Sequence, residues 1–377
     1  MRIGIDATTI YTSRPTGLGV YTINIVNELA GLHDDLVVWT VDDSMLAVDS
    51  GRIRRVMQPF RFLGNHLFQL RALWVESVLP ALVRKERVDV LYTTIPNAMS
   101  RPHVPQVVTV HDLIPLKFPQ DAPRTVRLNF RYRLPGILAR SAAVIAVSDF
   151  TRRDVLETYG LDPGKVTVVG EGYEEQLFRG EYDPRVLESH GLGAGGYYLY
   201  VGNASARKNL PRLIRAFAAV ASAVPCDLVL AGSKSPSERR ELESAAETAG
   251  IRGRVRFLDY VPRDHLPSLL SGAIAFVFPS LYEGFGLPVL EAMACGVVVV
   301  AANTTSIPEV AGDAALYVDP TDEKSMAEAL LRVRDPDLCR VLSRRGRERC
   351  RMFDWKDAAR RVLAVIASSS AVQAGIP

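Results

Sequence analysis

Two glutamates flank a glycine-rich turn in the segment 279–294. Glu283 precedes the turn 284–287, and Glu291 follows eight positions after Glu283. Pro288 suits the first turn of a helix, where a missing N–H is no loss, so Glu291 is expected about one turn inside that helix. A helix start favours anions and oxygen acceptors, and two carboxylates can accept hydrogen bonds from a polyol. An ordinary β–α turn with solvated glutamates is the alternative.

Two cations occupy a second turn between a predicted strand and a predicted helix. Arg207 and Lys208 come just before the helix, which begins at Asn209 or Leu210. Fixed positive charges beside a helix start would meet a diphosphate there. A solvated Arg–Lys pair without a ligand is the alternative.

The N-terminal half offers a histidine and two glycines. His111 lies at the carboxyl end of the predicted strand 107–110, at the rim where ligands bind in parallel sheets, although a purely structural histidine is equally compatible. Gly17 and Gly19 resemble part of a dinucleotide fingerprint, but the segment 6–15 before them is too long and the third glycine is missing. We therefore expect a flexible glycine loop beside a cleft and no nicotinamide site.

No metal site is expected from the sequence. Asp335 and Asp337 have Asp-x-Asp spacing but fall between two predicted helices. The four cysteines form no C-x-x-C pair, and no His/Cys cluster has zinc spacing. The P-loop and the G-x-S-x-G elbow are also absent. These patterns favour a metal-independent reaction in a protein with reduced thiols.

Composition excludes several classes of protein. The 377 residues are 48% hydrophobic and 23% charged, which is typical of a globular chain of two or three domains. The net charge of +3 is too small to indicate nucleic acid as a partner. No stretch approaches the 18 apolar residues of a membrane-spanning helix, and the start reads as a strand, not a signal peptide. A cytoplasmic location is expected.

Short Val/Ile-rich runs alternate with longer amphipathic stretches along the chain, which indicates parallel strands covered by helices. The fold class is therefore α/β, with two Rossmann-like doubly wound parallel-sheet domains and the site between them. The expected domains are 1–180 and 195–354, joined by a Gly/Pro-rich linker over 178–196 that contains a short helix. The expected strands are 2–5, 36–41, 88–92, 107–110, 143–147, 166–169, 197–201, 227–231, 255–258, 274–278, 297–301 and 315–318. The expected helices are 20–32, 66–84, 125–139, 150–159, 210–223, 237–249, 287–294, 325–333, 338–352 and 355–367.

Charge is distributed unevenly in the N-terminal half. Residues 1–50 carry two Lys or Arg against seven Asp or Glu, whereas residues 51–140 carry 15 against five. The basic residues interleave with apolar ones over 60–62 and 127–133. Such a surface can bind anionic lipid headgroups, so peripheral association with the inner face of a cytoplasmic membrane is one expectation. The alternative, which we weigh equally, is a solvated helix face that also contacts a phosphate-bearing acceptor.

Together these segments resemble the retaining glycosyltransferases of family 4, the group 1 family with the GT-B fold. The resemblance spans nearly the whole chain, and the Glu-x7-Glu motif from Glu283 to Glu291 is its most specific part. The segments 109–119 and 146–148 are similar to the subgroup of bacterial O-antigen and polysaccharide mannosyltransferases. Further matching segments are 201–209, 231–232, 257–262 and 307–315.

The resemblance implies a role for each matching residue. Arg207 and Lys208 would neutralise the donor diphosphate, and Glu291 would hold the ribose hydroxyls. Glu283 would hold the donor sugar, near His111. The catalytic set is thus His111, Arg207, Lys208 and Glu283. The implied donor-binding residues are Gly17, Gly19, Gly202, Asn203, Val261, Gly284, Phe285, Gly286, Leu287 and Glu291.

The resemblance also implies a reaction. A hexose, with mannose from GDP-mannose first and UDP-glucose or another hexose nucleotide behind it, would pass to a glycan or polyprenyl-diphosphate-linked acceptor. The anomeric configuration would be retained by same-face substitution, and no cofactor or metal would be needed. The C-terminal helix, about 355–377, would pack back on the first domain.

Two departures and three rival functions accompany this interpretation. Many family members carry an arginine where this chain has Asn203, so Arg207 would have to take over that charge. Glu171 replaces the asparagine of a common Asn-Gly in the hinge. A nucleotide-sugar epimerase, a nicotinamide dehydrogenase and a non-catalytic scaffold are the alternatives, which incubation with sugar nucleotides would separate.

Overall fold

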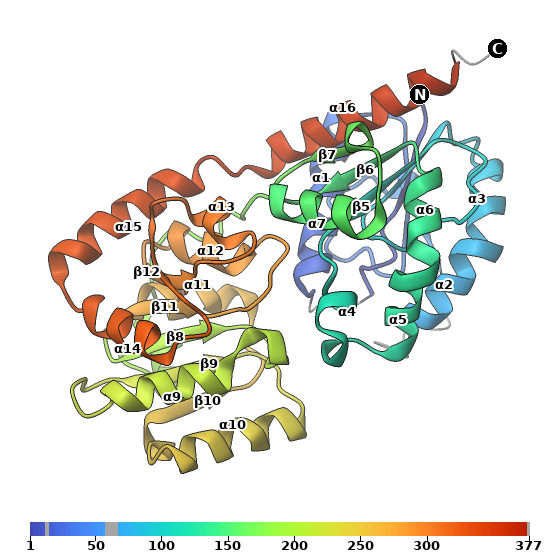
Figure 1. Cartoon of the computed structure of the whole chain (residues 1–377). Helices are drawn as coiled ribbons and strands as arrows, with labels where there is room; N and C mark the ends of the chain where they lie inside the picture. The colour runs from blue at the N-terminus through green and yellow to red at the C-terminus, as the bar shows by residue number, and fades with distance from the viewer. Residues whose placement is uncertain (12–14, 57–66, 375–377) are drawn as a thin grey trace. The chain divides into compact units, whose positions relative to one another are not determined.

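The computed structural model describes residues 1–11, 15–56 and 67–374 (Figure 1). These residues form two compact units. The first contains residues 1–172 and 354–377, and the second contains residues 173–353. The boundary differs from the predicted one, because the segment 178–196 belongs to the second unit and does not link the two.

A fully parallel seven-stranded sheet forms the centre of the first unit. Its order is β3-β2-β1-β4-β5-β6-β7, so the order reverses between β1 and β4, which pair directly. The central strands are buried along their whole length, as their continuous apolar sequences predict. The strands are β1 (Ile3–Asp6), β2 (Leu36–Thr40), β3 (Ile53–Arg55), β4 (Val90–Thr93), β5 (Gln106–Val110), β6 (Ala143–Ala146) and β7 (Val166–Val168).

Helices on both faces of this sheet bury its side chains. Trp39 of β2 and Trp74 lie in one core cluster, and Phe130 lies in a second. The helix α16 (Trp355–Ala374) packs against α1, and Tyr21 meets Trp355 edge-to-face (Figure 1). The other helices are α1 (Gly17–Leu32), α2 (Leu67–Ser77), α3 (Leu79–Lys85), α4 (Ile114–Lys117), α5 (Arg124–Leu128), α6 (Leu134–Arg140) and α7 (Asp149–Tyr159).

The second unit repeats this architecture with a six-stranded parallel sheet in the order β10-β9-β8-β11-β12-β13. Its order reverses between β8 and β11. The strands are β8 (Tyr197–Val201), β9 (Asp227–Ala231), β10 (Val255–Leu258), β11 (Ala275–Phe278), β12 (Val298–Ala302) and β13 (Ala315–Val318). The helices are α8 (Pro184–Ser189), α9 (Leu210–Val220), α10 (Pro236–Thr248), α11 (Leu266–Ser271), α12 (Leu287–Ala294), α13 (Ile307–Ala311), α14 (Glu323–Arg332) and α15 (Pro336–Cys350).

The segment predicted as a linker is fixed to the second unit by specific contacts. Leu187 of α8 is buried, and α8 packs against α11. The backbone N–H of Asp183 donates to Ser268 Oγ at 3.0 Å, and that of Gly195 donates to the Gly272 carbonyl at 2.8 Å. Glycine and proline here shape turns on a packed surface. Within the described residues, no helix is long and apolar enough to cross a membrane.

Candidate active site

Two loops meet at the point where the strand order of the second sheet reverses. One loop follows β8 and carries Arg207 and Lys208, and the other follows β11 and carries Glu283. Lys208 Nζ donates to Glu283 Oε1 at 2.6 Å, and Arg207 Nη1 donates to the same oxygen at 2.7 Å. Ligands bind at such a reversal in open α/β sheets, so the predicted cations and the first predicted carboxylate share the expected place.

Local backbone geometry explains why the two loops meet. Asn209 adopts the left-handed conformation, with φ of +63°, and its side chain donates to the carbonyls of Pro279 and Pro320 at 3.1 and 2.6 Å. The Leu281 N–H donates to the Arg207 carbonyl at 2.8 Å. Lys208 Nζ also lies 4.7 Å from the centre of the Phe278 ring. These contacts hold the lysine in a buried position, where its charge is poorly screened.

The electrostatics of this cluster favour an ionised Glu283. Burial alone would raise the pKa of Glu283, but the charges of Lys208 and Arg207 and their hydrogen bonds outweigh burial and hold the pKa below its usual value. Two cations and one carboxylate leave a net charge of +1 on the three side chains. The cluster is therefore suited to an incoming anion.

The glycine turn after Glu283 leads directly into α12, which begins at Leu287 as predicted. Gly286 has φ of +118°, and an added Cβ would lie 2.8 Å from Ile307 Cδ1, so only glycine fits without a shift. The single hydroxyl hydrogen of Ser306 is shared between the carbonyls of Glu283 and Phe285, whose oxygens lie 2.9 and 2.7 Å from Oγ, and this contact fixes the turn. The N–H groups of the first turn of α12 thus have a defined direction.

Glu291 belongs to a neighbouring cluster with a partner that sequence reasoning missed. Arg263 Nη2 donates to Glu291 Oε1 at 2.8 Å, and the same guanidinium pairs with Glu174. Burial opposes the charge of Arg263, but the two carboxylates outweigh it and raise the pKa of the guanidinium. Arg263 directly follows the segment 257–262, which matches the family, and it comes after a predicted strand end. This position could have identified Arg263 from the sequence.

The remaining predicted donor residues of this unit lie in the loops after β8 and β10. Gly202 follows β8 with φ of +151°, and Asn203 is exposed, with Oδ1 accepting from Ser205 Oγ at 3.0 Å. The Asn203 carbonyl accepts from Tyr200 Oη at 2.7 Å. Val261 is buried after β10.

His111 lies in the first unit and has both ring nitrogens engaged. Nε2 contacts the Thr94 carbonyl at 2.8 Å, and Nδ1 contacts Glu171 Oε1 at 3.3 Å. Carbonyl and carboxylate oxygens only accept, so both contacts are hydrogen bonds at once when the ring carries two hydrogens. Glu171, noted in the sequence as a departure in the hinge, thus has a defined partner.

Gly17 and Gly19 do not form the expected flexible loop. Both lie in the first turn of α1, which begins at Gly17 and not at residue 20. The Val20 N–H donates to the Thr16 carbonyl at 2.8 Å and closes that turn. Their first-turn N–H groups give a helix start of the kind that accepts anions.

The structure thus brings Arg207, Lys208 and Glu283 into direct contact beside the turn 284–287. It places Glu291 in a second cluster of the same unit, and His111 with the two glycines in the other unit. Among the described residues, no group of three or more His, Cys, Asp or Glu side chains is arranged to hold a metal ion.

Comparison with known proteins identifies the family. The Glycosyltransferase Family 4 model matches residues 15–177, and the model of glycosyl transferases group 1 matches residues 189–349. The chain is a glycosyltransferase and belongs to Glycosyltransferase Family 4, with a domain of the group 1 glycosyl transferases in its second half.

Two relatives and one solved structure show the extent of the similarity. The chain is 33% identical over 261 residues to O-antigen chain mannosyltransferase B of Escherichia coli, covering 67% of each chain. It is 34% identical over 290 residues to alpha-maltose-1-phosphate synthase of Mycolicibacterium smegmatis, covering 71% of this chain and 74% of that one. Sucrose-phosphate synthase from Thermosynechococcus elongatus superposes with a TM-score of 0.80 at 22% identity, over 99% of this chain and all of the other. The predicted GT-B fold is confirmed.

Proposed function

We propose that this glycosyltransferase moves mannose from GDP-mannose to a glycan or polyprenyl-diphosphate-linked acceptor in the synthesis of a surface polysaccharide. The observation that carries this proposal is the 33% identity to an O-antigen chain mannosyltransferase over two thirds of both chains. The acceptor class follows from the subgroup that the segments 109–119 and 146–148 resemble.

The charged cluster of the second unit supports an electrostatic mechanism. When the bond between the sugar and the nucleoside diphosphate breaks, negative charge develops on the leaving phosphate. Lys208 is a buried cation, Arg207 is a cation whose side chain is only 13% exposed, and the start of α12 adds oriented N–H groups. In this proposal the diphosphate takes over the hydrogen bonds that Glu283 now accepts, and Glu283 becomes available to hydroxyls of the donor sugar.

Two finer features of the reaction belong to the same proposal. Lys208 and Arg207 stand in place of a metal ion at the diphosphate, so no metal is required. No carboxylate of the second unit is unambiguously placed as a covalent nucleophile, since Glu283 and Glu291 are both bound to cations. Retention of configuration then follows from same-face substitution within an ion pair.

Transfer of glucose or another hexose from a UDP-sugar is the second candidate. It is favoured by the 34% identity to an alpha-maltose-1-phosphate synthase and by the likeness of the fold to a sucrose-phosphate synthase. Membership of the glycosyltransferase family leaves no support for the epimerase, dehydrogenase or scaffold alternatives.

Thermal denaturation with nucleoside diphosphates separates the two candidates. A ligand that binds only the folded protein raises its melting temperature. GDP is expected to raise it more than UDP or ADP at equal concentration, and GDP-mannose is expected to support transfer. A larger shift with UDP, together with transfer from UDP-glucose alone, would move the assignment to the second candidate.

We also propose that the basic region of the first unit contacts an anionic membrane surface. Leu128 and Tyr132 are 44% and 70% exposed, and Arg124 and Arg131 are exposed on the same helical stretch. Exposed apolar side chains flanked by arginines suit a headgroup region. The other stretch of interleaved basic and apolar residues, 60–62, lies outside the described residues.

A further inference from the structure

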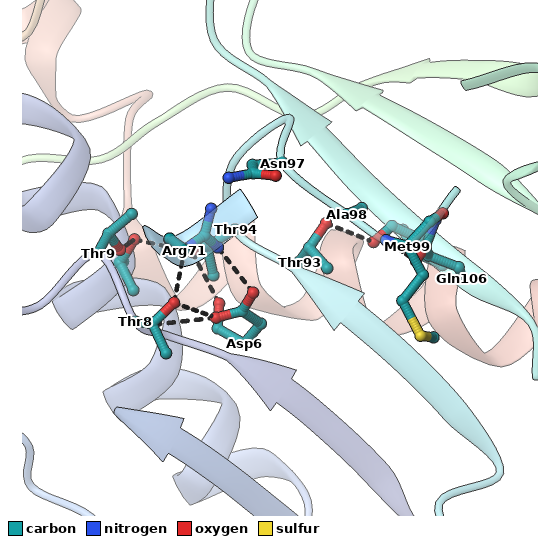
Figure 2. Close-up of polar contacts among 12 residues, drawn as sticks. Asp6, Thr8, Thr9, Arg71, Thr93, Thr94, Asn97, Ala98, Met99 and Gln106 are labelled. Carbon is teal, nitrogen blue, oxygen red and sulfur yellow. Dashed lines mark hydrogen bonds and ion pairs between the residues drawn. The ribbon is translucent and has the colours of Figure 1, made fainter. Parts of the chain in front are cut away.

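The strand order of the first sheet reverses between β1 and β4, and a buried polar cluster lies there (Figure 2). Asp6 ends β1, and Thr94 follows β4 directly. Thr94 Oγ1 donates to the Asp6 carbonyl at 3.2 Å. All of these side chains are buried. The corresponding reversal in the second unit holds the Lys208–Glu283 pair, so the first unit also has its polar groups where such sheets bind ligands.

Arg71 of α2 is the cation of this cluster, and only 2% of it is exposed. Its Nη2 donates to Asp6 Oδ2 at 2.7 Å, and its Nε donates to Thr8 Oγ1 at 2.6 Å. Its third nitrogen, Nη1, is buried and has no hydrogen-bond partner among the residues that the structure describes. A buried guanidinium N–H without an acceptor costs the free energy of its desolvation, so Nη1 points to a missing acceptor.

Two asparagine amides that accept from Arg133 are in the same situation. Arg133 Nη1 donates to Asn97 Oδ1 at 3.0 Å and to Asn129 Oδ1 at 3.3 Å. Because an arginine can only donate, these contacts fix which end of each amide faces it. Both Nδ2 groups are therefore turned away from Arg133, and both are buried without a partner within the described part of the chain. In Figure 2 the amide nitrogen of Asn97 lies toward Arg71.

Electrostatics link Arg71 to Arg133, the arginine that holds both asparagines. Burial is the main cause that lowers the pKa of Arg71, and the nearby charge of Arg133 lowers it further. Each arginine has one carboxylate, Asp6 for Arg71 and Glu76 for Arg133. The segments 12–14 and 57–66, which lie outside the described residues, contain no Asp or Glu. The orphaned groups are all donors, so their common partner must be rich in acceptors.

We propose that this cluster, made of Arg71, Asn97, Asn129 and Arg133, binds a phosphoryl group of the acceptor. A phosphate or diphosphate ester offers several anionic oxygens, which can accept from the guanidinium and both amides together. The identity of the molecule that carries the phosphate rests on the proposed function. The binding of phosphate itself does not.

The position of the cluster fits this role. The Thr94 carbonyl accepts from His111, and Asn97 lies three residues further along the same loop. The phosphoryl group would thus be held beside the histidine predicted to lie near the acceptor. The Arg133–Glu76 pair is the partly exposed edge of the cluster, with side chains that are 23% and 36% exposed, and in this proposal the phosphate enters there. A phosphate would replace the Glu76 carboxylate on Arg133 and reach the amides behind it.

Calorimetry of the full chain with inorganic phosphate and with pyrophosphate tests the proposal without any sugar substrate. Asn97→Ala and Asn129→Ala each remove one amide donor, together with one acceptor of Arg133, and spare the buried Arg71–Asp6 pair. Each variant is expected to weaken pyrophosphate binding by about tenfold, as for a lost hydrogen bond to a charged group. Arg140→Ala is the control, because Arg140 is exposed on α6 and, within the described part of the chain, donates to the Gly136 carbonyl of its own helix.

Separate arms identify the source of the phosphate. Binding that is lost in Lys208→Ala but unchanged in both asparagine variants would assign pyrophosphate to the donor site alone and overturn the proposal. Binding of phosphatidylglycerol vesicles that falls in the asparagine variants while pyrophosphate binding does not would also overturn it, since the cluster would then be a lipid-headgroup site. If neither asparagine variant changes the affinity for phosphate or pyrophosphate, the proposal is overturned, and buried water is then the partner of these donors.

A kinetic arm links the cluster to the acceptor. The KM for a sugar phosphate acceptor is expected to rise about tenfold in Asn97→Ala, with kcat little changed. The KM for the methyl glycoside of the same sugar should stay as in the wild type. Failure of mannosyl transfer would remove the proposed function, yet the calorimetric result for phosphate would stand independently.

Discussion

Lys208 Nζ lies 2.6 Å from Glu283 Oε1, so the main cation of the site is neutralised by a carboxylate of the neighbouring loop before any ligand binds. Arg207 shares that oxygen at 2.7 Å. In the proposed mechanism, an incoming diphosphate exchanges with Glu283, and this exchange would couple donor binding to the position of the carboxylate. Because all three groups are poorly exposed, the exchange occurs where charge interactions are strong.

The first prediction concerns Lys208. Lys208→Ala should cripple turnover, because a lost contact to the leaving group costs about 2–4 kcal/mol by analogy with a lost oxyanion donor. Lys208→Arg should retain more activity, since it keeps the charge. Steady-state kcat/KM of both variants gives the comparison, with Arg215→Ala as the control, because Arg215 forms an exposed pair with Glu323. Turnover of Lys208→Ala close to the wild type would remove the lysine from the mechanism.

The second prediction is the response of stability to acid. The pKa of Glu283 is held below its usual 4.5 in the folded protein, by Lys208 and Arg207 against the opposing effect of burial. A carboxylate with a lowered pKa contributes stability that is present above pH 4.5 and is lost as the pH falls through the folded pKa.

The free energy of unfolding should therefore fall more steeply below pH 4.5 in the wild type than in Glu283→Gln. Denaturant unfolding at a series of pH values measures both slopes. Glu323→Gln, which removes an exposed partner of Arg215, is the control and should keep the wild-type slope. Equal slopes in the wild type and Glu283→Gln would show that the triad does not depress the pKa of Glu283.

The third prediction is that transfer survives excess EDTA. In the proposed mechanism, Lys208 and Arg207 supply the positive charge that a metal ion would otherwise bring to the diphosphate. Initial rates with and without EDTA should agree within error, in buffers of matched ionic strength. Activity that disappears with EDTA and returns only with Mg²⁺ or Mn²⁺ would show that the two cations are not sufficient.

The fourth prediction concerns the apolar side chains on the basic face of the first unit. A Leu128→Ser/Tyr132→Ser double variant should lose most of its binding to vesicles that contain phosphatidylglycerol, and wild-type binding should weaken with salt. Leu331→Ser, at a 41% exposed position of α14, is the matched control. Equal binding of the wild type to neutral phosphatidylcholine vesicles, or no binding to either, would return these residues to the role of a solvated helix face.

The strands of both sheets were predictable because buried parallel strands are continuous apolar runs. The missed strand, β3, is an edge strand in which two of three residues are arginines. The predicted helix 66–84 is two helices, since Pro80 lacks the N–H that would continue the first one. The predicted helix 125–139 is confirmed as one helical stretch from Arg124 to Arg140, with a π-helical segment over Asn129–Arg133 just before Pro135, which has no N–H to donate.

The candidate site was predictable where its residues are close in sequence to a strand end. Arg207, Lys208 and Glu283 all lie in turns after strands, and parallel strands bring such turns to one edge. Arg71 gave no such signal, because an arginine inside a helix of a basic region is typical of a solvated face. Its partner Asp6 is 65 positions away, and only the packing of α2 beside β1 brings them together.

The last prediction separates the two glutamates of the Glu-x7-Glu motif. Glu291 lies inside α12 and is held by Arg263, whereas Glu283 lies before the glycine turn and is held by the two cations. If Glu291 accepts from the ribose hydroxyls, Glu291→Ala should weaken free nucleoside diphosphate and intact donor about equally. Each lost hydrogen bond to a charged group is worth roughly 1.5–3 kcal/mol.

Glu283→Ala should behave differently, because Glu283 competes with the diphosphate for Lys208 and Arg207. Its removal should leave the affinity for free diphosphate unchanged or raise it, while donor binding or turnover falls. Calorimetry with the diphosphate and with a non-transferable donor analogue gives both affinities for each variant. If Glu283→Ala lowers diphosphate affinity as much as Glu291→Ala does, the pair is a joint nucleotide clamp. Another group, with His111 as the first candidate, would then have to orient the sugar.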